Sequence, residues 1–230
     1  MEEKITKQRI IFYIDGFNFY YGLKQNNWKK YYWLDIVKFC LSFIDNKKQE
    51  LILVKYFSAI DMNKDRAKRQ NKFFSVNKQN NKFKLELGNF QYKDITCYQP
   101  KITKCPQCSE EVNFTCKSVF KMPEEKKTDV NIATHLISDC INNMCDVSIL
   151  ISGDSDLTPP LIFIKNHKPE HRINVFFPPN REGYHLKQIA HNYVFLSNYK
   201  QRFKESVFPD KIEIGGEGSG SFINKPERWI

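Results

Sequence analysis

One short segment constrains the fold of this chain more than any other: residues 146–151 form a largely apolar run that stops at a turn containing Gly153. Such a run, bounded by turn residues, is typical of a strand buried inside a parallel sheet. Asp154 and Asp156 therefore follow the carboxyl end of this strand, where open α/β sheets bind their ligands. Two carboxylates this close repel each other, so they need a cation, a shared proton or bulk water beside them. The alternative is that one of them only caps the helix that begins near Leu157.

A second segment of the same kind occupies residues 9–15 and ends in Asp15, which Gly16 follows. An Asp-Gly pair often does no more than begin a turn. Here the next residues, 17–22, are mostly aromatic and continue as a helix, so the order strand, acid, helix is favoured. A third buried strand is predicted at residues 50–57.

Helices and strands alternate through the rest of the chain. Residues 33–44 carry an apolar stripe at helical spacing, as expected of a helix that covers a sheet. Residues 128–140 form another amphipathic helix, with Thr128 as its N-cap and Asp129 in its first turn, where the helix dipole alone already favours an anion. Later strands are predicted at residues 172–177 and 193–196. This alternation predicts a doubly wound, mostly parallel α/β sheet.

Four of the seven cysteines are arranged symmetrically in a polar stretch. Cys105 and Cys108 form a C-x2-C pair that contains a proline, and Cys97 and Cys116 flank it with seven residues between on each side. Four thiolates are a common tetrahedral Zn²⁺ site, so the pattern predicts one structural zinc ion that shapes an insertion at residues 97–116. Disulfides or free thiols without a metal are the alternative, and the absence of an export signal favours thiols over disulfides.

The balance of charge indicates an anionic partner. Lys and Arg number 36 against 26 Asp and Glu, which gives a net charge of +10 spread along the chain. Such a field favours nucleic acid first, although anionic membrane surfaces and simple solubility are other interpretations. The basic segment at residues 64–82 is the first candidate for RNA phosphates, with a solvated helix face as the alternative. We identify no signal peptide and no apolar run of transmembrane length, so a cytoplasmic protein without membrane contact is expected.

Three motifs, together with the cysteine-rich insertion before the second of them, resemble the NYN family of PIN-like nucleases. The motifs are the strand ends at residues 13–18 and 151–156 and the helix start at residues 127–133, and the resemblance runs from about residue 9 to about residue 196. The resemblance implies a PIN-like three-layer α/β/α sandwich over residues 1–207, with residues 97–116 as its zinc-binding insertion. Beyond it, the glycine-rich composition of residues 208–230 predicts a flexible tail.

The same resemblance implies a metal-dependent ribonuclease that hydrolyses RNA with Mg²⁺ or Mn²⁺. By position, Asp15, Asp129, Asp154 and Asp156 would be the metal ligands, and Asn18 would line the pocket. The residues support this independently, because acids that end parallel strands or begin the following helices meet at one edge of the sheet. Ligand sets made only of oxygen atoms select hard cations such as Mg²⁺ and Mn²⁺ over zinc.

Three other functions compete with this one. A catalytically weak adaptor that binds RNA or protein through the same fold would have no need of acids in all three motifs. A phosphatase of the haloacid dehalogenase type requires a second Asp two residues after the first, where this chain has Phe17. A dinucleotide enzyme needs a glycine-rich first turn, and Gly16 stands alone. The RNA substrate and the oligomeric state stay open, a homo-oligomer included.

Overall fold

A six-stranded, wholly parallel sheet forms the centre of the molecule in the computed structural model, which describes residues 6–215 and 220–229 apart from the side chains of Phe114 and Cys116. The strand order is β10-β9-β8-β1-β2-β3. The predicted α/β class is therefore confirmed. The strands are β1 (Gln8–Asp15), β2 (Gln49–Ser58), β3 (Phe83–Leu87), β8 (Val147–Ile151), β9 (Arg172–Phe177) and β10 (Asn192–Phe195).

The strand order contains one reversal, and it lies at β1. The chain builds outward from β1 through β2 to β3, then returns to place β8 on the other side of β1 and builds outward again through β9 to β10. The connections that follow β1 and β8 therefore diverge to opposite faces of the sheet. Their divergence opens a crevice beyond the carboxyl ends of these two strands, which is the general position of ligand sites in open α/β sheets.

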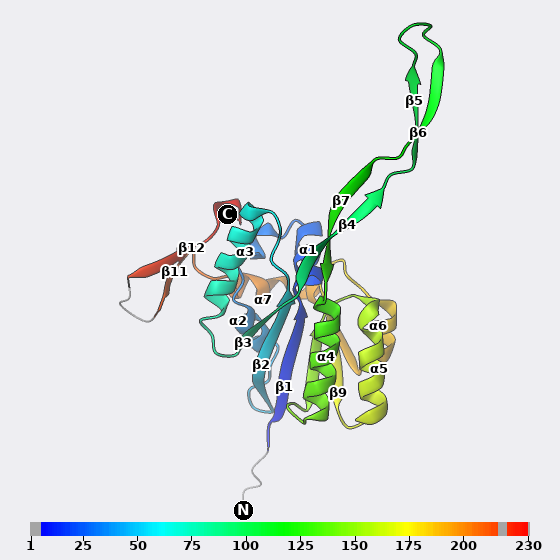
Figure 1. The fold of residues 1–230 in the computed structure, drawn as a ribbon. Helices are drawn as coiled ribbons and strands as arrows, with labels where there is room; N and C mark the ends of the chain where they lie inside the picture. Colours follow the sequence, from blue (N-terminus) through cyan, green and yellow to red (C-terminus); the bar gives the residue numbers. More distant parts are fainter. Residues whose placement is uncertain (1–5, 216–219, 230) are drawn as a thin grey trace, which may run out of the picture.

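Helices cover both faces of the sheet, which completes a three-layer sandwich (Figure 1). Along β1 the side chains alternate: Ile10, Phe12 and Ile14 pack in one core cluster, whereas Ile11 and Tyr13 pack in the other. Burying one such apolar side chain stabilises the fold by roughly 1.5–3 kcal/mol. One face is covered by α1 (Gly16–Gln25), α2 (Ile36–Leu41), α3 (Lys64–Asn77) and α7 (Lys200–Glu205), and the other by α4 (Thr128–Ile141), α5 (Thr158–His167) and α6 (Tyr184–Ile189).

Two details of the helices differ from the sequence prediction. The helix expected at residues 33–44 is shorter, because Asp35 accepts a hydrogen bond from the backbone N–H of Lys38 and caps α2 at Ile36. Leu41, placed on the buried stripe by its spacing, is 39% exposed because it lies in the last turn of that helix. None of the helices within residues 6–215 and 220–229 is long and apolar enough to cross a membrane.

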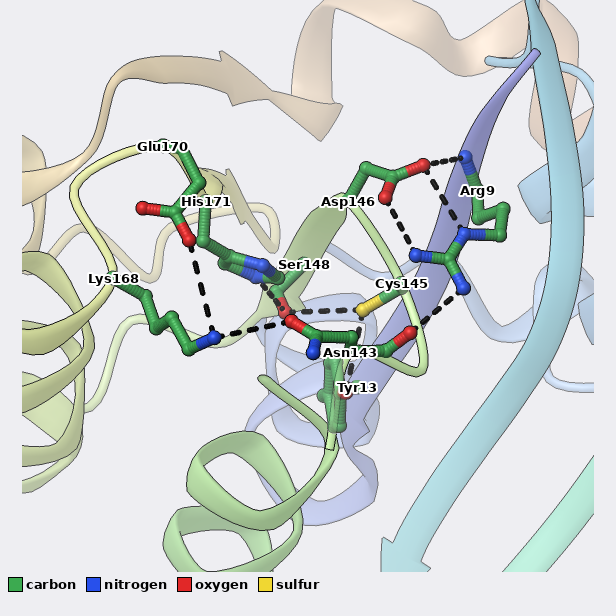
Figure 2. A network of polar contacts seen from close by, with 9 residues as sticks. All are labelled: Arg9, Tyr13, Asn143, Cys145, Asp146, Ser148, Lys168, Glu170 and His171. Carbon is green, nitrogen blue, oxygen red and sulfur yellow. Dashed lines mark hydrogen bonds and ion pairs between the residues drawn. The ribbon is translucent and has the colours of Figure 1, made fainter. Parts of the chain in front are cut away.

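Polar contacts connect β1 and β8 at their amino ends, on the side of the sheet away from the crevice, as Figure 2 shows. Arg9 donates from its backbone N–H to Asp146 Oδ2 at 2.8 Å and from Nη2 to Asp146 Oδ1 at 2.7 Å. Nearby, the buried Ser148 hydroxyl lies 2.8 Å from His171 Nε2, which links β8 to the start of β9. These contacts support the register of β1 against β8, and this register determines which residues of the two strands lie together at the other edge.

A long two-stranded arm projects from the body between β3 and α4 (Figure 1). Its lower part pairs β4 (Asn89–Thr96) with β7 (Val119–Lys126), and its upper part pairs β5 (Gln99–Lys104) with β6 (Glu111–Cys116). One side of the arm runs from Asn89 to Lys104, and an extended chain of this length covers roughly 50 Å at about 3.3 Å per residue. The predicted insertion at residues 97–116 is thus only the outer half of a longer structure, and it forms a hairpin.

The segment after residue 207 packs against the body, which corrects the prediction of a flexible tail for the part of it that the structure describes. Strands β11 (Lys211–Ile214) and β12 (Ser221–Asn224) form an antiparallel hairpin, and Trp229 follows in a short 3-10 helix, η4 (Glu227–Trp229). Apolar side chains of this segment cause the docking, since Phe208, Ile212, Ile223 and Trp229 all pack against the core. Residues 216–219, in the glycine-rich stretch, lie outside the described residues.

Candidate metal centre

Asp15 lies at the carboxyl end of β1, with only 4% of its surface exposed. One carboxylate oxygen accepts the backbone N–H of Asn18 at 3.0 Å and so caps α1, and the other accepts the hydroxyl of Ser152 at 2.9 Å. A glycine is required next, because a Cβ on Gly16 would lie 2.6 Å from the carbonyl oxygen of Phe57. Burial outweighs the two hydrogen bonds and raises the pKa of Asp15 to about 6.

Asp154 follows the carboxyl end of β8, on the neighbouring strand. Its Oδ1 atom accepts the backbone N–H of Asp156 at 3.0 Å and caps a short 3-10 helix, η2 (Ser155–Leu157). Gly153 permits the tight turn before it, since a Cβ there would lie 2.5 Å from the carbonyl oxygen of Arg181. Capping and metal binding, the two alternatives that the sequence left open, are compatible, because a carboxylate that caps with one oxygen keeps the other.

Asp129 reaches the same place from the first turn of α4. The N-cap position of α4 is held by Lys127, in a left-handed conformation with φ of 79°, rather than by Thr128 as predicted. The Thr128 backbone N–H donates to Glu125 Oε1 at 3.1 Å, so a residue of the arm satisfies the start of the helix. Burial, and then the negative charge of Asp154, raise the pKa of Asp129 to about 6.

The three acids converge. A ligand oxygen of each of Asp15, Asp129 and Asp154 lies within 4.8 Å of the other two, and Asp129 and Asp154 are more exposed than Asp15. Carboxylates held this close disfavour one another's ionised forms, and a divalent cation relieves that cost. A set of oxygen ligands fits a hard cation such as Mg²⁺ or Mn²⁺. We call Asp15, Asp129 and Asp154 the acidic triad.

The remaining predicted residues lie beside the triad and have other surroundings. Asp156 is exposed and outside the triad, yet its charge also raises the pKa of Asp129. Asn18 lines the cavity, but its side-chain oxygen accepts the backbone N–H of Gly153 at 3.0 Å. Asn18 therefore links α1 to the turn after β8, and this contact helps to hold Asp15 and Asp154 at their separation.

A cavity of about 270 Å³ lies over the triad. Among its lining residues that the sequence did not reveal, Arg181 is the one cation, and its Nε is buried without a hydrogen-bond partner within the described residues. Arg181 belongs to the connection between β9 and α6, which ends at the same edge of the sheet as Asp15 and Asp154. The proline pair after β9 was the available signal for this loop. The lining is completed by Phe17, Asn18, Tyr21, Phe90, Glu125 and Thr128.

The four cysteines of the predicted zinc site do not come together in the described backbone. Cys97 lies just beyond β4 and Cys116 pairs opposite Gln99, so both occupy the base of the outer hairpin. Cys105 and Cys108 occupy its tip, beyond the pair Lys104 and Glu111. Gln99 and Lys104 are five residue steps apart along an extended strand, and at about 3.3 Å per step the tip lies roughly 17 Å or more from the base. The described backbone does not bring the four cysteines to one point, so the predicted four-thiolate zinc site is not confirmed.

Comparisons with known proteins agree with this architecture. A curated protein from Pseudomonas putida (strain DSM 28022 / S16), named 6-hydroxy-3-succinoylpyridine 3-monooxygenase HspA, is 28% identical over 206 residues, which cover 80% of this chain and 64% of the relative. A crystal structure of a protein of unknown function from Vibrio parahaemolyticus, VPA0982, shares the fold with a TM-score of 0.52 at 17% identity, over 84% of this chain and 95% of that one. The family model described as NYN domain matches residues 9–197, a span that contains the whole acidic triad. This chain therefore belongs to the NYN domain family.

Proposed function

We propose that this protein is a metal-dependent ribonuclease whose active site is the acidic triad. The observation that carries the proposal is the convergence of Asp15, Asp129 and Asp154 within 4.8 Å at the crevice beside the sheet reversal. Burial raises the pKa values of Asp15 and Asp129 to about 6, which means that it destabilises the ionised form of both carboxylates. A cluster that destabilises its own charged forms is more readily explained by cation binding than by packing.

The side chains of the site have separable roles in this proposal. Asp15, Asp129 and Asp154 would hold Mg²⁺ or Mn²⁺, which would supply an activated water and neutralise charge on the phosphodiester. Arg181, the cation in the cavity lining, would bind the non-bridging oxygens of the scissile phosphate through its guanidinium group. Ser152 and Asn18 are positioning residues: Ser152 fixes one oxygen of Asp15, and Asn18 fixes the turn that carries Asp154.

RNA as the substrate rests on charge. An acidic crevice repels a polyanion unless the surrounding surface attracts it, and the net charge of +10 supplies that attraction. Helix α3 carries five basic side chains, at Lys64, Arg66, Lys68, Arg69 and Lys72. We propose that RNA spans this surface and the crevice.

Two other functions compete with the ribonuclease proposal. An adaptor built on the same fold would bind RNA without cleaving it, and the buried carboxylates would then have no task. The P. putida relative is named as a monooxygenase of a pyridine derivative, but 28% identity over 64% of that protein is too little to assign the same chemistry to this chain. The ribonuclease proposal is the one that uses the triad, Arg181 and the basic surface together.

The proposal is tested by cleavage of a labelled single-stranded RNA with Mn²⁺ and with EDTA. Asp154→Asn keeps the side-chain volume and an oxygen that can cap η2, so it should fold but lose at least 100-fold in rate, since both the ion and its activated water are lost. Asp94→Asn, an exposed acid on the arm, is the matched control and should cleave as fast as wild type. Equal rates for Asp154→Asn and wild type, with both shown to be folded, would assign the activity to another source and favour the adaptor.

A further inference from the structure

A second cavity of about 250 Å³ lies between α1 and α3, beside the one over the triad. The two cavities share Phe17 and Tyr21, which line both and so form the partition between them. Its floor is the buried ring of Tyr56 on β2, and Trp229 of the docked C-terminal segment closes one side. We call this space the aromatic pocket.

Half of the residues that line the aromatic pocket are aromatic, so flat ring surfaces form much of its wall. Tyr20 and Tyr32, both only partly buried, lie with their ring centroids 5.0 Å apart, and Trp229 lies 5.8 Å from Tyr32. Burial raises the pKa of Tyr20 and raises that of Tyr32 to about 12, so both side chains stay uncharged at physiological pH. Such a wall accepts a planar heteroaromatic ring by stacking.

Cations stand at the rim of the aromatic pocket. Arg66 and Arg69 line it from α3 and Lys24 lines it from α1. Arg66 is 63% exposed and pairs at 3.6 Å with Asp61, which also lines the pocket, and such a pairing at a wet surface is weak. A ligand that combines a planar ring with an adjacent anion matches this lining, and a nucleotide has that chemistry.

The position of the pocket selects among nucleotide ligands. Because Phe17 and Tyr21 border both cavities, a strand whose phosphate lay at the acidic triad would bring a neighbouring nucleotide close to the aromatic pocket. A base that is paired in a duplex is stacked and hydrogen-bonded, so it cannot enter without being unpaired. Single-stranded nucleic acid is commonly held in this way, by bases on aromatic side chains and phosphates on nearby cations.

We infer that the aromatic pocket is a base-binding subsite for single-stranded RNA, in which an unpaired nucleobase stacks on Tyr20 and contacts the ring of Tyr32, tilted 49° to it, while its phosphate contacts Arg66 and Arg69. This inference rests on the proposed function, because it assigns the base next to the scissile phosphate. It also makes binding separable from cleavage, since none of these four residues belongs to the acidic triad.

The test is a binding assay in the Asp154→Asn background, so that the RNA probe survives. The probe is a fluorescent 12-nucleotide single-stranded RNA of mixed sequence, and its perfect duplex is the competitor. Tyr20→Leu keeps an apolar side chain but removes the ring, and should weaken binding about 10-fold by loss of stacking. Tyr20→Phe keeps the ring and should bind like its parent. Thermal unfolding of each variant shows that it is folded.

The arginines have a matched control on the same helix. Arg66→Gln/Arg69→Gln and Lys64→Gln/Lys68→Gln each remove two positive charges from α3, but only the first pair lines the pocket. The arginine variant should lose more affinity and show a shallower salt dependence than the lysine variant. Equal losses for the two pairs, or Tyr20→Leu binding as tightly as Tyr20→Phe, would overturn the subsite. Wild type that binds through Tyr20 but does not cleave would instead overturn the ribonuclease proposal alone.

Discussion

The charge of Asp15 gives the sharpest quantitative prediction. Its folded-state pKa of about 6, against an ordinary value of 3.8, is a rise of about two units, and each unit corresponds to 1.36 kcal/mol. Because the folded state holds this proton more tightly than the unfolded state, metal-free protein should lose stability as the pH rises from about 4 to about 6. Above that range the ionised Asp15 destabilises the fold by about 3 kcal/mol.

Asp15→Asn removes this cost and introduces a smaller one. The amide oxygen can replace only one of the two acceptors that Asp15 offers to Asn18 and Ser152, and one lost hydrogen bond costs about 1 kcal/mol. We expect the variant to be more stable than wild type by roughly 2 kcal/mol at pH 7.5 in EDTA, from these two terms together. At pH 3.5 the order should be reversed, because wild-type Asp15 is then largely protonated in both the folded and the unfolded state, so the cost of its ionisation is almost absent.

Urea unfolding at both pH values measures this change of sign. Asp94→Asn, an exposed acid on the arm, is the control and should match wild type at each pH. Mn²⁺ at pH 7.5 should stabilise wild type and leave Asp15→Asn nearly unchanged, because a cation that binds only the folded state adds to its stability. A variant less stable than wild type at pH 7.5 in EDTA would refute the reasoning that burial of Asp15 is costly.

Three further predictions follow from the site and the arm. Arg181→Gln should lower the cleavage rate by 10-fold or more while leaving Mn²⁺ affinity unchanged by calorimetry, because Arg181 contacts phosphate rather than metal; lost metal affinity would contradict that role. RNA affinity should fall steeply between low and moderate salt, through counterion release, and a flat response measured by fluorescence anisotropy would remove the electrostatic argument. The hairpin separates Cys97 from Cys105, so the two cysteines should not hold the same zinc ion, and the zinc content of Cys97→Ser and Cys105→Ser should differ by elemental analysis. Equal loss of one full equivalent of zinc in both variants would favour a single four-cysteine site and a different hairpin register.

The fold was largely predictable because two apolar strands that end in acids carry most of the topological information. Asp15 and Asp154 follow β1 and β8, and parallel neighbours necessarily present their carboxyl ends at one edge. Their convergence with Asp129 was therefore expected, and the distances agree with it. Metal binding by the triad stays a proposal.

Features that depend on contacts between residues far apart in the chain could not be predicted from the sequence. Arg181 lies in a loop whose position is determined by β9 and the turn at Gly153, so local pattern gives no sign of its approach to the acids. The cysteine spacing is equally consistent with a closed loop and an extended hairpin, and only strand pairing distinguishes the two. Docking of the C-terminal segment depends on a few apolar residues, Trp229 among them. The glycine-rich composition of the segment gives no sign of this packing.

The arm has a consequence for the triad that follows from how the chain is connected. Asp15 and Asp154 are attached to two adjacent strands in the middle of the sheet, whereas Asp129 lies three residues after the end of β7 and begins the helix that the arm leads into. The triad thus consists of two carboxylates, Asp15 and Asp154, that follow central strands of the sheet, and a third, Asp129, whose backbone is continuous with the projecting arm. A partner that tilts the arm would move Asp129 against the other two, and distances from a spin label on β5 to one on β9, with and without RNA, would detect that tilt.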